Sequence, residues 1–122
     1  MSWILVGALW GCLGVGLGAF GAHGLRATAS SQALGWWQTA TLYHLVHALA
    51  LVLTGLVALQ APRAEMAGWA FLLGSLVFSG SLYAMALGAP RWLGAVTPLG
   101  GLAMMAGWLL LAWAARTPLG RG

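Results

Sequence analysis

Apolar residues form four long runs in this chain, and short segments between the runs hold its charged side chains. The runs cover residues 3–22, 36–59, 67–87 and 95–115. A membrane-spanning helix needs about 20 residues to cross roughly 30 Å of hydrocarbon, and each run reaches that length. The pattern therefore predicts an all-α fold, an integral membrane bundle of four transmembrane helices that forms one domain over residues 1–122.

The composition agrees with this prediction. Hydrophobic residues make up 61% of the chain and charged residues 5%, whereas soluble domains carry about 25% charged residues. Such hydrophobicity excludes an intrinsically disordered chain. Cys12 is the single cysteine, which excludes a disulfide-stapled fold. The lipid bilayer is thus the first expected partner.

The net charge of +4 comes from one glutamate and five arginines. They are scattered singly along the chain, so nucleic-acid binding is not expected. Four spans put both termini on one side of the membrane. That side holds three arginines, Arg63, Arg116 and Arg121, and the other side holds two, Arg26 and Arg91. The positive-inside rule then predicts cytoplasmic termini.

The first apolar run is expected to stay in the protein. Its small residues, 18–22, resemble a signal-peptide cleavage site. However, no basic segment precedes the run, and its length exceeds the 7–15 apolar residues of a signal peptide.

Glycines recur every three or four residues along the first predicted helix, which places them on one face (Gly7, Gly11, Gly14, Gly18, Gly21). Membrane helices associate through small residues because these allow close backbone approach. The preferred interpretation is packing against neighbouring helices of the same chain. A second copy or a partner protein is the alternative.

Polar residues gather in one half of the predicted membrane region. We expect them to face each other inside the bundle, because unpaired polar groups are costly in lipid. The candidates for a polar pocket are His23, His44, His47, Tyr43, Ser79, Ser81, Tyr83 and Thr97.

Three roles are open for the histidines. Neutral imidazoles could bond to serine, tyrosine or a backbone carbonyl as structural groups, and we expect His47 to have such partners. His23, His44 and His47 could instead hold a metal or haem, although three histidines without a carboxylate are a weak signature. A path for protons or a small solute is the third possibility. No metal or other cofactor is assigned, and no catalytic motif is present, so we expect no enzymatic activity.

Several segments resemble a known family. They include residues 18–25, GAFGAHGL, residues 37–40 with 43–48, WQTA and YHLVHA, residues 78–83, FSGSLY, and residues 97–101 with 106–108, TPLGG and AGW. Together they resemble the small membrane proteins catalogued as domain of unknown function 423, whose bacterial members are called YgdD-like and whose animal relative is transmembrane protein 256. The resemblance implies a four-helix protein, of the inner membrane in bacteria, without an established activity. That family also has Gln at the position of His44, which weakens the case for His44 as a ligand.

Two functions are therefore carried forward. One is a small accessory subunit that packs through its glycine-rich helices against itself or a larger membrane complex. The other is a membrane protein with a histidine-lined pocket for a metal, haem or small solute, or for protons.

Overall fold

The computed structural model of the chain describes residues 1–116 and consists of four long helices joined by short turns. Three turns contain a 3₁₀ helix: η1 (Leu25–Ala27), η2 (Pro62–Ala64) and η3 (Arg91–Ala95). The long helices are α1 (Trp3–His23), α2 (Ser31–Ala58), α3 (Glu65–Ala86) and α4 (Thr97–Ala115). All four are long and apolar enough to cross a membrane. The predicted fold class is confirmed.

The helix boundaries differ from the predicted runs where a polar cap lies outside the apolar sequence. α2 begins at Ser31 rather than at residue 36, because the Ser30 hydroxyl accepts a hydrogen bond of 3.1 Å from the backbone N–H of Ala33. Such a cap satisfies an N–H group that has no partner within the helix. Residues 31–35 are therefore a helical extension of the span instead of part of the connecting loop.

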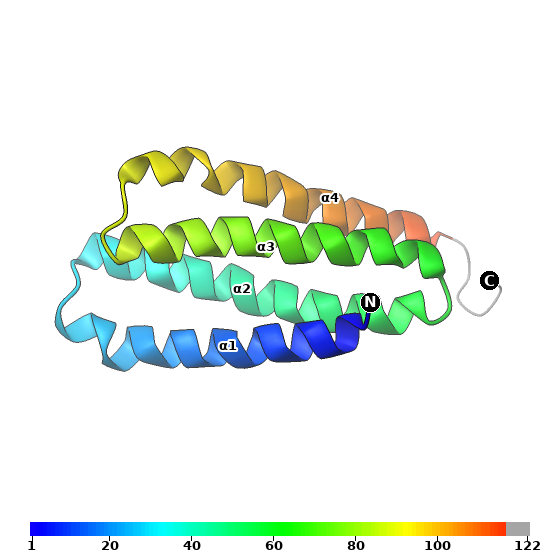
Figure 1. Cartoon of the computed structure of the whole chain (residues 1–122), viewed down its shortest axis with the longest axis horizontal. Coiled ribbons are helices and arrows are strands. Elements are labelled where there is room, and N and C mark those ends of the chain that lie inside the picture. The colour runs from blue at the N-terminus through cyan, green and yellow to red at the C-terminus, as the bar shows by residue number, and fades with distance from the viewer. Residues whose placement is uncertain (117–122) are drawn as a thin grey trace.

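The helices pack in chain order, with α1 on α2, α2 on α3 and α3 on α4. Each runs antiparallel to the one before it, so the N-terminus lies at the same end as the end of α4 (Figure 1). The connection between α2 and α3 also lies at this end, as four spans require (Figure 1). α1 and α4 form the two edges of the arrangement, and most of their outward side chains are exposed.

The glycine face of α1 is occupied within the chain by α2. A Cβ atom added at Gly7 would lie 2.8 Å from the carbonyl oxygen of Ala48, and one at Gly14 would lie 2.7 Å from Leu45 Cδ2. Added Cβ atoms at Gly11, Gly18 and Gly21 would also meet side chains of α2. In this structure the stripe therefore lies against a neighbouring helix of the same chain. A second copy or a partner protein would find this face covered by α2.

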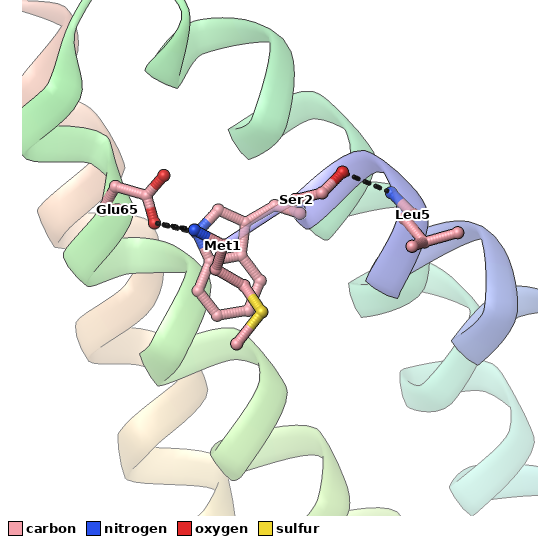
Figure 2. A network of polar contacts seen from close by, with 5 residues as sticks. Met1, Ser2, Leu5 and Glu65 are labelled. Carbon is pink, nitrogen blue, oxygen red and sulfur yellow. Dashed lines mark hydrogen bonds and ion pairs between the residues drawn. The ribbon is translucent and has the colours of Figure 1, made fainter.

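The end of the bundle that carries the N-terminus is held by the only acidic residue of the chain. The indole N–H of Trp3 donates to Glu65 Oε2 at 2.6 Å, while the Trp3 ring covers Gly68 of α3. Figure 2 shows the ammonium group of Met1 facing the same carboxylate, at 3.9 Å, and the Ser2 hydroxyl accepting from the backbone N–H of Leu5. Glu65 thus anchors the start of α1 to the start of α3.

Arg63 ties the end of α4 to the same region. Its Nη2 donates to the carbonyl oxygen of Ala114 at 2.6 Å, and its guanidinium lies 5.8 Å from the ring centroid of Trp113. Arg116 lies 5.7 Å from the same ring. A cation near the last carbonyls of a helix also interacts favourably with the helix dipole.

Candidate functional site

The two histidines of α2 belong to different hydrogen-bond networks. Both are buried, with 0% of His44 and 4% of His47 exposed. His44 bonds to groups of α1 and α3, whereas His47 bonds to a group of α4. The eight candidate residues therefore do not form one pocket.

The first network joins α1, α2 and α3 around His44. Its Nε2 lies 2.7 Å from the carbonyl oxygen of Trp10, and its Nδ1 lies 3.0 Å from the hydroxyl of Tyr83. A carbonyl can only accept, so Nε2 carries the proton and donates. In the neutral ring, Nδ1 then accepts from Tyr83, whose oxygen lies 3.2 Å from the Thr41 hydroxyl. This buried histidine has no ring nitrogen left for a ligand.

Trp10 closes the same network from the side of α1. Its ring stacks on His44 with centroids 3.8 Å apart, and its N–H donates to Ser75 of α3 at 3.0 Å. Ser75 in turn donates to the carbonyl oxygen of Leu72. Neither Trp10 nor Ser75 was among the polar candidates predicted from the sequence. The contact between α1 and α3 that pairs Trp10 with Ser75 cannot be recognised from the spacing of residues along one helix.

Two glycines of α1 give side chains of α2 access to carbonyl oxygens of α1. His44 reaches the carbonyl of Trp10, four residues before Gly14, and Trp37 donates to the carbonyl of Leu17, four residues before Gly21, at 2.7 Å. A Cβ added at Gly14 would lie 3.3 Å from His44 Nε2, and one at Gly21 would collide with the Trp37 ring. The stripe therefore supports interhelical hydrogen bonds as well as close packing.

The second network joins α2 to α4 through His47. The Trp108 indole N–H donates to His47 Nε2 at 3.1 Å. His47 Nδ1 lies 2.8 Å from the carbonyl oxygen of Tyr43, to which it donates. Of the partners expected for His47, only the backbone carbonyl is right. No serine or tyrosine hydroxyl bonds to His47 within residues 1–116, and its partner Trp108 was missed.

A groove of about 480 Å³ lies next to this second network. Residues of α2, α3 and α4 line it, and His47 and Trp108 are among them. Almost all of its lining is apolar or aromatic, and none of the lining residues is charged. Tyr43 borders the groove, packs against Phe78 with ring centroids 4.6 Å apart, and has 40% of its surface exposed. The residues that line the groove include Tyr43, His47, Phe78, Gly101, Met105 and Trp108.

The remaining polar candidates make separate helix contacts. Ser79 donates to the carbonyl oxygen of Ala40 at 2.7 Å, which ties α3 to α2. The hydroxyls of Ser81 and Thr97 lie 2.5 Å apart and tie α3 to α4. These residues lie between helices, as expected of polar groups in a membrane, but they do not border the groove.

His23 lies away from the other histidines. It is the last residue of α1 and is exposed, so it does not join His44 or His47 as a ligand. Within residues 1–116, no three His, Cys, Asp or Glu side chains are placed to hold a metal ion. Cys12 is also exposed on α1, outside the bundle interior.

Four apolar spans joined by short turns, with the polar side chains paired between helices, define an integral membrane protein. The chain belongs to the family described as protein of unknown function (DUF423), whose model matches residues 17–101. It is 45% identical over 109 residues to a UPF0382 membrane protein of Staphylococcus haemolyticus, covering 88% of this chain and 89% of that protein. It is 41% identical over 115 residues to the UPF0382 membrane protein YwdK of Bacillus subtilis, covering 92% and 94%. No solved structure matches the chain.

Proposed function

We propose that this protein is a non-enzymatic protein of the bacterial inner membrane that binds an apolar molecule from the bilayer in the groove between α2 and α4. The observation that carries the proposal is the groove itself. Its volume of about 480 Å³ falls within the range of roughly 300–1,000 Å³ typical of ligand sites. Its lining is apolar and aromatic, which suits a molecule that enters from lipid.

The hydrogen bonds around the histidines favour this function over metal binding or proton transfer. Each ring nitrogen of His44 and His47 already has a partner. Both networks also end at backbone carbonyl oxygens, those of Trp10 and Tyr43, which can accept a hydrogen bond but cannot pass a proton on. Both histidines therefore hold helices in place, and His47 also lines the groove.

An accessory-subunit function has less support, because the glycine stripe on which it rested is covered by α2. A second copy or a larger complex would have to bind outward-facing side chains instead. α1 and α4 are the least buried of the four helices.

The proposed orientation has cytoplasmic termini. Arg63 and Arg116 lie at the end of the bundle that holds the N-terminus, and Arg26 and Arg91 belong to the connections at the other end (Figure 1). Arg121, the third arginine of the predicted cytoplasmic side, lies outside the described residues. The positive-inside rule supports this orientation through the arginine count of the whole sequence.

Native mass spectrometry of the protein extracted from bacterial membranes tests the groove. We compare the wild type with Gly101→Leu, since a Cβ at Gly101 lies at an ordinary distance of 3.8 Å from Phe78 and the longer side chain fills the groove. Gly80→Leu is the matched control, because a Cβ at Gly80 meets nothing within 4 Å. We expect an uncharged lipophilic adduct on the wild type and on Gly80→Leu, and its loss from Gly101→Leu.

An adduct that Gly101→Leu retains in full, or no adduct on the wild type, overturns the proposal. The same spectra report association with other chains. A stable complex of several chains in which no lipophile is bound would favour the accessory-subunit function instead.

A further inference from the structure

The hydroxyl of Tyr43 is the free polar group of the groove. Within residues 1–116 it has no hydrogen-bond partner, whereas the nitrogens of His47 and Trp108 beside it are paired. Tyr43 lies twelve residues into α2, which spans Ser31–Ala58, and therefore about 18 Å along the helix. This part of α2 lies in the predicted hydrocarbon region, where an unpaired O–H group costs free energy. A bound molecule that carries a hydrogen-bond acceptor would therefore pair with the Tyr43 hydroxyl.

That acceptor must be uncharged. None of the residues that line the groove is charged, and a charge in hydrocarbon without a partner costs free energy. A phospholipid keeps its phosphate near the membrane surface, so only its acyl chain would reach the groove. An acyl chain has no acceptor to offer Tyr43.

The aromatic lining favours a flat ring. Tyr43, Phe78 and Trp108 all border the groove, and Phe78 packs beside the Tyr43 ring with their planes at 49°. Aromatic rings bind other flat rings by offset or edge contacts. Met105, which also lines the groove, has a flexible side chain that adapts to irregular shapes.

We infer that the groove binds an isoprenoid quinone, with a ring carbonyl accepting a hydrogen bond from Tyr43 and the apolar tail extending into the bilayer. The inference rests on the proposed function and specifies its ligand. A quinone is uncharged, has a flat ring with carbonyl acceptors and carries a lipid-soluble tail, so it meets all three requirements of the groove. No electron transfer is part of the inference.

Titration of the delipidated protein in detergent with a short-chain menaquinone tests this. Squalene serves as the matched probe, since it is an isoprenoid without a ring or a carbonyl. Binding of each probe is measured by native mass spectrometry for the wild type, Tyr43→Phe, Gly101→Leu and the Gly80→Leu control. Loss of one hydrogen bond changes an equilibrium by about three- to tenfold. We expect Tyr43→Phe to weaken menaquinone binding by this factor and to leave squalene binding unchanged.

The outcomes separate the inference from the proposed function. Equal menaquinone affinity of the wild type and Tyr43→Phe, or equal weakening of both probes, overturns the quinone assignment while groove binding stands. If Gly101→Leu binds both probes as tightly as the wild type does, the proposed function is overturned as well. The infrared carbonyl band of menaquinone bound to the wild type gives a second measurement that does not depend on how Tyr43→Phe folds. We expect a shift to lower frequency, and an unshifted band contradicts the inference.

Discussion

The indole N–H of Trp108 donates to Nε2 of His47 across 3.1 Å, and this bond determines which nitrogen of the histidine carries the proton. An indole can only donate, so Nε2 must be unprotonated. The proton therefore lies on Nδ1, which donates to the carbonyl oxygen of Tyr43 at 2.8 Å. His47 is thus neutral, and it holds α4 against α2 at the groove.

Substitution of His47 should distinguish this role from a passive one. His47→Leu leaves the Trp108 indole N–H without its acceptor, and a donor left unpaired away from water costs about 1–3 kcal/mol. In His47→Gln, the side-chain oxygen can still accept from Trp108. We expect His47→Leu to unfold at a clearly lower denaturant concentration in mixed micelles, and His47→Gln to retain most of the wild-type stability. Equal stability of all three proteins would show that the bond contributes nothing.

The glycine stripe gives a second prediction with a control on the same helix. Gly14→Leu places atoms where Leu45 and His44 lie, whereas a Cβ at Gly16 meets nothing within 4 Å. Overpacking of this kind costs about 1–3 kcal/mol. We expect Gly14→Leu to lower expression and thermal stability in detergent, and Gly16→Leu to behave as the wild type. The stripe has no packing role if both variants are equally stable.

The number of helices and the packing face of α1 could be predicted from the sequence, because both depend on local patterns. Runs without charge define the spans, and the three- and four-residue spacing from Gly7 to Gly21 defines one face. Packing against neighbouring helices of the same chain was the preferred interpretation, and in the structure this face lies against α2. The family resemblance is confirmed by the match over residues 17–101.

The pairing of polar groups could not be predicted in the same way, because it depends on how helices are rotated against each other. His44 and His47 are three residues apart, yet one bonds towards α1 and α3 and the other towards α4. A tyrosine was among the partner types expected for His47, but Tyr83 bonds to His44 instead. Trp108 was missed because its position along α4 says nothing about which neighbour it faces.

Reporter fusions test the orientation. A reporter fused to the C-terminus should be active only in the cytoplasm, and one inserted in the connection at Arg26 only on the opposite side. Four spans place these two positions on different sides of the membrane. Two reporters on the same side would contradict the number of spans, and exchanged sides would contradict the orientation alone.

The last prediction concerns the network around His44, where Tyr83 serves two neighbours at once. Its hydroxyl lies 3.0 Å from His44 Nδ1 and 3.2 Å from the Thr41 hydroxyl. Tyr83→Phe keeps the ring but leaves the Nδ1 atom of a fully buried histidine without a partner, at a cost of about 1–3 kcal/mol.

Thr41→Val is the matched control, because it removes only the outer hydroxyl and leaves the bond between Tyr83 and His44 intact. Its cost should stay below about 1 kcal/mol, since a partly buried hydroxyl contributes only a modest net hydrogen bond. The double variant Tyr83→Phe/Thr41→Val should cost less than the sum of the single variants, because the three groups form one network. Denaturant unfolding in mixed micelles measures all three free energies. Strict additivity would mean that the hydroxyls of Tyr83 and Thr41 act independently, contrary to the chain of hydrogen bonds that ends at the carbonyl of Trp10.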